Sequence, residues 1–223
     1  MNTKRNGFAQ TSLPHALYHL ADAANWASIQ QYGLLSTSAL LDLAGIQGRE
    51  REQLEQRQRI RQMTLTTGTI IGGQNPMPPT ALERCLQGMT PYEWYALLNA
   101  RVFFWLDIGR LNRMQKANHH RGQVVMVLDT EQLLANYAEQ TALTPINTGN
   151  ARRKAALRGR QTFVPYNTWV ESRWTSEAEA LGTRVRPGNH SPAELTIAGA
   201  VPDVMKFVRQ IAHLKPGEIF TVS

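Results

Sequence analysis

The stretch Glu194–Gly199, ELTIAG, decides how the chain is interpreted, because it places one carboxylate at the start of an apolar segment. Successive side chains of a β-strand point to opposite faces, so Leu195 and Ile197 share a face and Glu194 lies on the other. We therefore expect a strand with a core face and a second face that opens on a cleft. Glu194 is then either a charge at a strand edge or a catalytic carboxylate, and the rest of the chain must decide between them.

The residues that follow predict a helix over 202–214. Pro202 suits the first position of a helix. Apolar side chains recur at helical spacing and form the expected inner face: Val201, Met205, Val208 and Ile211.

Composition indicates an ordinary globular protein. A chain of 223 residues fits one domain with a real core, and 42% hydrophobic residues exclude general disorder. No apolar run approaches the roughly 18 residues of a membrane span, and the N-terminus lacks the apolar segment of a signal peptide. Cys85 is the single cysteine, so the chain forms no internal disulfide. We expect a cytoplasmic protein that is neither exported nor membrane-bound.

The positive charge is clumped, which favours a polyanionic partner. The formal net charge is +7, and the segment Gly109–Arg121 contributes four cations without an acid. A second basic stretch, Ala151–Arg160, is expected to be an exposed loop that contacts nucleic acid, because unpaired charges are costly to bury. The alternative is a solvated basic loop, or one that contacts an acidic protein. The cations of this second stretch are Arg152, Arg153, Lys154, Arg158 and Arg160.

Strands and helices mix without regular βαβ spacing, which predicts an α+β fold. The clearest strands are Ala16–Leu20, Arg101–Asp107 and the buried Gly122–Thr130. A charged surface helix is predicted over 47–63, and the glycine- and proline-rich residues 64–80 then predict a hairpin or an irregular loop.

Several common chemistries are missing from the sequence. No glycine-rich dinucleotide or phosphate-binding motif and no nucleophile elbow occurs. His15 and His19 are four residues apart, but on a strand this spacing separates them by about 13 Å. His119 and His120 lie in a basic segment without a nearby acid. We therefore expect no metal site.

Three stretches read together resemble the ADP-ribosyltransferase fold, in particular the DarT-type nucleic-acid ADP-ribosyltransferases. They are LYHLADAANWASIQQYGLLS (residues 17–36), RVFFWLD (101–107) and AELTIAGAVPDVMKFVRQI (193–211). The strongest resemblance is to bacterial proteins of unassigned function that share NxRVFFW, PINTG and TFVP. The resemblance implies one domain over residues 1–223, built on a split mixed sheet with surrounding helices. Residues 47–79 are then a family-specific insertion.

The resemblance also implies a site. Glu194 falls on the catalytic glutamate of the family, His19 on the histidine that binds the adenosine side of NAD, and the aromatic strand on the wall of the nicotinamide pocket. The alternatives are a core histidine at position 19, an ion pair with a surface acid for Arg101, a helix cap for Ser36, and turn residues for Asn147 and Thr148. The implied cofactor-binding residues are His19, Gly33, Leu34, Ser36, Arg101, Phe103 and Trp105.

The function that follows is an NAD-dependent mono-ADP-ribosyltransferase that modifies nucleic acid in a toxin–antitoxin or phage-defence setting. NAD is the co-substrate, no metal is required, and an antitoxin protein is a candidate partner. A carboxylate can stabilise the oxocarbenium-like ribosyl centre and deprotonate the acceptor. Two alternatives stay open: an RNA 2′-phosphotransferase, and an inactive relative that binds a nucleotide or nucleic acid.

Overall fold

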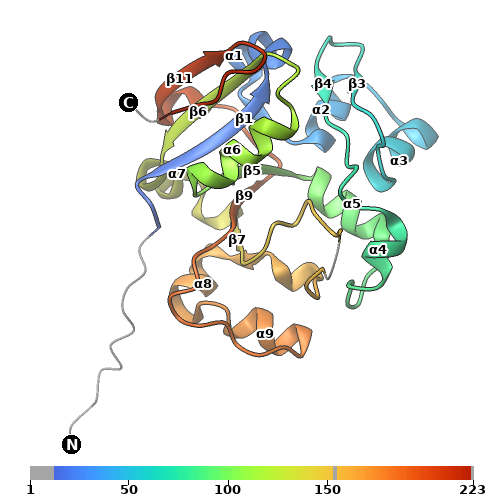
Figure 1. Cartoon of the computed structure of the whole chain (residues 1–223). Helices are drawn as coiled ribbons and strands as arrows, with labels where there is room; N and C mark the ends of the chain where they lie inside the picture. Colours follow the sequence, from blue (N-terminus) through green and yellow to red (C-terminus); the bar gives the residue numbers. More distant parts are fainter. Residues whose placement is uncertain (1–12, 153–154, 222–223) are drawn as a thin grey trace, which may run out of the picture.

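A computed structural model describes residues 13–152 and 155–221 and shows an α+β fold (Figure 1). Its main sheet has seven strands in the order β11–β6–β1–β5–β9–β7–β8. The strands are β1 (Ala16–Asp22), β5 (Arg101–Trp105), β6 (Gln123–Asp129), β7 (Thr141–Thr144), β8 (Val164–Pro165), β9 (Glu194–Ala198) and β11 (Val208–Leu214).

All neighbours in this sheet are antiparallel, so the expected mixed sheet is wrong. Strands that run in the same direction are separated in the sheet: β5 and β6 both run opposite to β1, and β1 lies between them, so strands of equal direction do not become neighbours.

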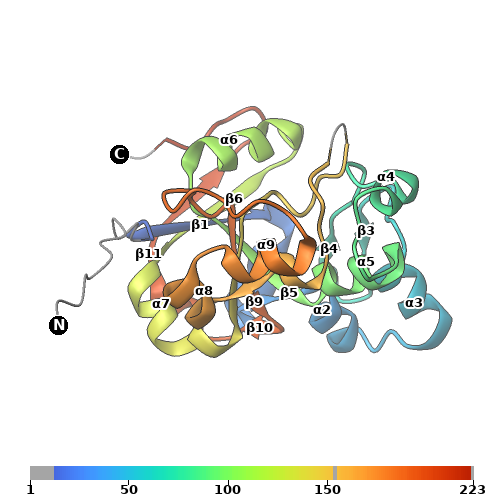
Figure 2. The same cartoon turned by 90° about the horizontal axis from the view of Figure 1, so that it is seen from below.

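Helices cover both faces of the sheet (Figure 2). Helix α6 (Ile108–Ala117) and the segment 145–152 lie on one face, which carries Glu194 and which we call the Glu194 face. The opposite face packs against α1 (Trp26–Tyr32), α7 (Thr130–Tyr137) and α8 (Tyr166–Ser172) in the largest apolar cluster. The remaining elements are β2 (Leu34–Leu35), α2 (Thr37–Leu43), α3 (Gly48–Gln56), β3 (Met63–Thr64), β4 (Ile70–Ile71), α4 (Pro79–Glu83), α5 (Pro91–Asn99), α9 (Thr175–Leu181) and β10 (Ala200–Val201).

Strand β6 anchors the sheet because every one of its residues is buried. Val125 and Val127 pack with α6, whereas Val124, Met126 and Leu128 enter the large cluster on the opposite face. Both faces are covered, which explains why the sequence of this strand is a continuous apolar run rather than an alternating one.

The sheet opens between β1 and β5. One register pair, Tyr18 with Trp105, joins these strands, whereas β1 pairs with β6 along its whole length. Beyond Tyr18 the two strands separate, and the Nδ1 atom of His19 lies 2.9 Å from the backbone oxygen of Phe103. A carbonyl oxygen only accepts, so Nδ1 carries the proton and bridges the opening.

The predicted helix over 202–214 is wrong. A 3₁₀ turn (Val204–Phe207) leads instead into β11, which pairs with β6, and Met205 is exposed rather than inward-facing. Helical spacing is only a local preference. Without β11 the buried strand β6 would be left as a sheet edge, so tertiary pairing overrides the pattern.

Residues 40–72 include a second, smaller core. Helix α3 ends at Gln56, earlier than the predicted helix, and the expected hairpin forms between β3 and β4. The guanidinium of Arg59 donates to the backbone oxygens of Leu54 and Gly72 and to Asn99 of α5, and burial lowers its pKa to about 10. This arginine therefore ties the smaller core to the rest of the domain. The apolar residues of that core are Leu41, Ile46, Leu54, Leu65 and Ile71.

Gly33 is required where α1 meets the β2–β10 pair. Its φ is +74°, and an added Cβ would lie 2.3 Å from the backbone oxygen of Val201. We predict that Gly33→Ala lowers the free energy of unfolding by on the order of 3 kcal/mol, through backbone strain and steric overlap together. Gly45 has a similar φ of +68° but no atom within 4 Å of the added Cβ, so Gly45→Ala should cost only about 1 kcal/mol. Urea unfolding of both variants measures the difference, and equal losses would contradict the close approach.

Candidate active site

Glu194 is the first residue of β9 and is enclosed on all sides. It lies opposite Trp105 of β5 and Thr144 of β7, and only 3% of its surface is exposed. Its Oε2 accepts from the backbone nitrogen of Thr148 at 3.1 Å and from the Thr148 hydroxyl at 2.7 Å. The expected cleft on this face is therefore wrong: the turn formed by PINTG (residues 145–149) covers the carboxyl.

The electrostatic setting of Glu194 is unusual for a carboxylate. Burial raises its pKa above the ordinary glutamate value, and the hydrogen bonds from Thr148 and Thr144, with the charge of Arg110, oppose that rise. Within the described residues, no cation lies within ion-pair distance of the carboxyl. The carboxyl therefore holds its proton to a higher pH than an exposed glutamate does.

The Thr144 hydroxyl makes two contacts with only one proton. It lies 3.0 Å from Glu194 Oε2 and 2.9 Å from the backbone oxygen of Ile146. If it donates to Ile146, its contact with Glu194 requires the carboxyl proton, and Thr148 is then the one described residue that still donates hydrogen bonds to the ionised form.

Arg158 supports the PINTG turn through hydrogen bonds from its guanidinium to backbone oxygens. Its Nη1 donates to the backbone oxygens of Thr148 and Asn150 at 3.3 and 2.9 Å, and its guanidinium lies over the Trp94 ring. Arg158 is 2% exposed, so its predicted role in nucleic-acid binding is wrong. Three carbonyl oxygens, including that of Ala156, replace water around this cation, and burial lowers its pKa.

The other cations of the basic stretch have different surroundings. Arg152 and Arg160 are exposed, and Arg152 donates to the backbone oxygen of Asn75 at 3.1 Å. Arg153 and Lys154 lie outside the described residues. The stretch is therefore partly an internal brace and partly an exposed cationic surface.

His19 belongs to a separate cavity of about 230 Å³ at the end of β1. Burial lowers the pKa of His19, so the ring is neutral; because Nδ1 bears the proton, Nε2 is an acceptor. Gly33 and Leu34 also line this cavity, as do Asp22 and Arg121, whose ion pair spans 2.6 Å. Three of the predicted cofactor-binding residues are thus brought together.

The other four predicted cofactor-binding residues do not line that cavity. The Ser36 hydroxyl caps α2 by accepting from Ala39 N, which is the structural alternative for this residue. Arg101 lies 4.7 Å above the Phe163 ring and donates to Thr196 at 3.2 Å, and it makes no ion pair with an acid of the described chain. Phe103 and Trp105 are half-buried among apolar side chains on the Glu194 face.

Strand β5 separates the two parts of the predicted site. Tyr18, Trp105 and Glu194 are aligned across three strands, which places the backbones of Tyr18 and Glu194 about 10 Å apart. His19 follows Tyr18 and therefore points to the face opposite Glu194. The site is thus two regions on either side of the sheet opening, rather than one pocket.

Sequence reasoning missed the residues that enclose Glu194. Thr148 was interpreted as a turn residue, Thr144 was not singled out, and Arg110 was noted only for its charge. The sequence contained one signal, the two threonines Thr144 and Thr148 next to and within PINTG. It points to Glu194 only when the pairing of β7 with β9 is known.

Comparison with protein families matches residues 15–208 to a family of unknown function (DUF7002), and the chain belongs to this family. No curated protein matches the chain. Among residues 13–152 and 155–221, no group of three or more histidine, cysteine, aspartate or glutamate side chains is arranged to hold a metal ion. No helix in these residues is long and apolar enough to cross a membrane.

We predict that Thr148→Ala raises the pKa of Glu194 further and lowers the free energy of unfolding by about 1–3 kcal/mol, because a buried carboxyl loses a hydroxyl donor. Thr148→Ser keeps both donors and should restore the parent values. Carbon-13 NMR titration of the carboxyl, assigned by its loss in Glu194→Gln, measures the pKa. Identical titrations in the alanine and serine variants would show that Thr148 does not control the carboxyl.

Proposed function

We propose that this protein transfers ADP-ribose from NAD to a nucleic-acid acceptor, with Glu194 as the catalytic carboxylate. One observation carries the proposal: a carboxyl that has no counter-ion among the described residues is buried at the start of β9, one strand away from the opening of the sheet. The resemblance of the three sequence stretches supports it by implying a catalytic glutamate at this position, and the neutral His19 lines a cavity on the other side of β5.

Burying this carboxyl is costly for a purely structural role. A neutral glutamine would accept the same two hydrogen bonds from Thr148 without the penalty of desolvating a charge. Functional sites are where such costs are tolerated, because a carboxyl with a raised pKa is a stronger base once it is ionised.

The chemistry is balanced without a further reagent. The glycosidic bond between the ribose C1′ and the nicotinamide nitrogen breaks, and nicotinamide leaves with the electron pair. The ionised Glu194 stabilises the positive charge that develops at C1′ and accepts the proton of the attacking acceptor group. A new bond then joins C1′ to that acceptor atom. In this scheme the Nε2 atom of His19 accepts from a hydroxyl of NAD in the neighbouring cavity.

A binding protein without catalysis is the second candidate, and the enclosure of Glu194 favours it. The PINTG turn must move for the carboxyl to reach NAD, because Thr148 occupies the space above Oε2. Release of nicotinamide from NAD distinguishes the two candidates directly.

We predict that the purified protein releases nicotinamide from NAD and that Glu194→Gln lowers the rate by about 10²-fold or more. The ionised carboxylate is the active form and its pKa is raised by burial, so the rate of the parent should fall as pH decreases, beginning above the range of an ordinary glutamate. Thr148→Ala should move this fall in rate to higher pH, and Thr148→Ser should restore the pH dependence of the parent. Release at an unchanged rate in Glu194→Gln would remove Glu194 from the mechanism.

A second prediction concerns His19. Replacement by Asn retains a donor for Phe103 O but leaves no acceptor at the position of Nε2, so NAD affinity should fall about fivefold, the value of one hydrogen bond. Calorimetric titration gives the affinity, and the rate at saturating NAD should change less than the affinity. Loss of the folded circular-dichroism spectrum in His19→Asn would instead assign His19 to the core.

A further inference from the structure

Helix α6 presents a row of cations to solvent. Arg110, Arg113 and Lys116 are spaced three residues apart and therefore follow one another along one side of the helix. Leu111 and Gln115 are buried on its inner side, which fixes the direction of the outer side. Arg113 and Lys116 are exposed and Arg110 is half-buried. We call these three residues the α6 row.

The α6 row is not neutralised by the protein. The helix contains no acid, and Asp107, which precedes it, accepts a hydrogen bond from the backbone nitrogen of Arg110. In the part of the chain that the structure describes, no cation of the row forms an ion pair, whereas Arg121 and Arg209 each pair with an aspartate. Charges left in this state are available to a ligand.

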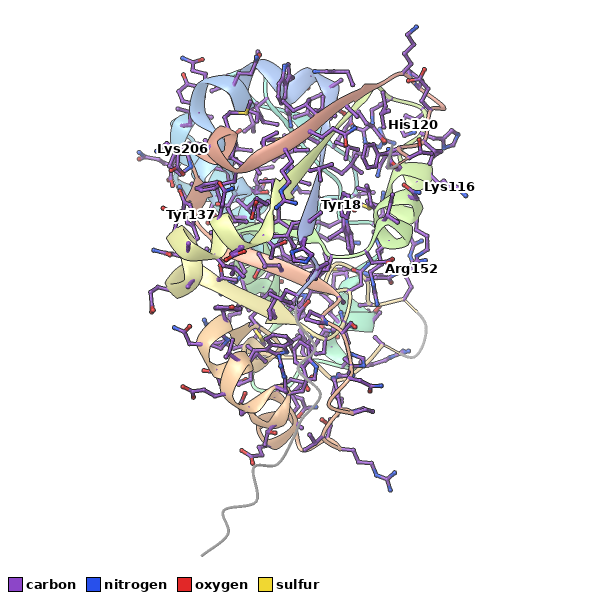
Figure 3. All side chains as sticks on the ribbon, turned by 90° about the vertical axis from the view of Figure 1, so that its left-hand side faces the viewer. Tyr18, Lys116, His120, Tyr137, Arg152 and Lys206 are labelled. Atoms are coloured by element: carbon purple, nitrogen blue, oxygen red, sulfur yellow. The ribbon has the colours of Figure 1, made fainter. Side chains whose placement is uncertain are left out.

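The row leads toward Glu194. Helix α6 lies on the Glu194 face, and Arg110 in its first turn is close enough to attract the Glu194 carboxylate. Lys116 and His120 lie at the far end of the row, and Arg152 lies further along the same edge of the molecule (Figure 3). Two further exposed cations, Arg152 and Arg160, follow in sequence the PINTG turn that covers the carboxyl.

We propose that the α6 row binds the phosphodiester backbone of a nucleic-acid strand and leads it toward Glu194. The delivery of the strand to Glu194 rests on the proposed function, but binding of the strand can be measured without turnover of NAD. Six residues of helix separate Arg110 from Lys116, which is about 9 Å along the axis. At about 3.4 Å per nucleotide of a stacked strand, the row spans two to three phosphates. Regularly spaced cations without intervening acids suit a repeating anion better than the irregular charges of an acidic protein surface.

The test is the salt dependence of strand binding. Fluorescence anisotropy with labelled (dT)₂₀ and (U)₂₀ measures affinity between 50 and 200 mM salt for the parent and for Arg113→Gln/Lys116→Gln. Each phosphate contact contributes about 0.7 to the slope of log affinity against log salt for single strands, so losing two contacts should flatten the slope by about 1.4. Across this fourfold change in salt, the affinity advantage of the parent should shrink about sevenfold.

The control removes two exposed cations elsewhere, in Lys206→Gln/Arg49→Gln. Lys206 lies on the opposite edge of Figure 3 from Lys116, and Arg49 belongs to α3. The control should keep the slope of the parent. The proposal would be overturned by equal slopes in all three proteins, by equal losses in the two variants, or by no strand binding by the parent. It would also be overturned if poly-glutamate competed as effectively, per charge, as either strand does. If the slope flattens as expected and NAD is not cleaved, the proposed function fails while the binding surface stands.

Discussion

A buried carboxyl that has no counter-ion among the described residues constrains the half of the domain around β7 and β9. Glu194 requires donors, and the backbone nitrogen and hydroxyl of Thr148 supply them. The PINTG turn that carries Thr148 requires a support, which is the guanidinium of Arg158. Arg158 is itself a buried cation, satisfied by carbonyl oxygens and by the face of Trp94. Each buried polar group is thus acceptable only because the next one is in place, as expected where the local dielectric is low.

The opening of the sheet between β1 and β5 makes this arrangement relevant to function. β1 follows β6 for its full length but leaves β5 after one register pair, so backbone groups of β5 face a gap that His19 bridges. A continuous sheet would use those groups in a ladder and leave no cavity beside His19. The gap and the enclosed carboxyl lie on the two sides of β5. A ligand that contacted both would therefore have to extend across β5, and the PINTG turn would have to move away from the carboxyl.

Features of the fold and of the candidate site could be predicted from the sequence only where the interaction that determines them is between residues close together in the chain. The run Gly122–Thr130 identified β6, because a strand that is buried on both faces leaves a local signal in the sequence. The segment that forms β11 was predicted as a helix, because the helical spacing of its apolar residues is visible in the local sequence. Its pairing with β6 joins residues far apart in the chain and is not visible there. The enclosure of Glu194 depends on a turn 46 residues earlier in the chain, so the strand was identified correctly and its second face was not.

The charge of the protein separates into two kinds of cation, and only one kind indicates a partner. The argument that a basic loop must stay exposed was wrong for Arg158, because backbone oxygens and an aromatic face can solvate a guanidinium inside the protein. Arg59 follows the same rule beside Asn99. Cations satisfied in this way contribute to the net charge of +7 but have no capacity left for a ligand. The surface cations of α6, which lack ion pairs within the described chain, retain that capacity. Their arrangement, rather than the total charge, is therefore the physical basis for expecting a polyanion on the Glu194 face.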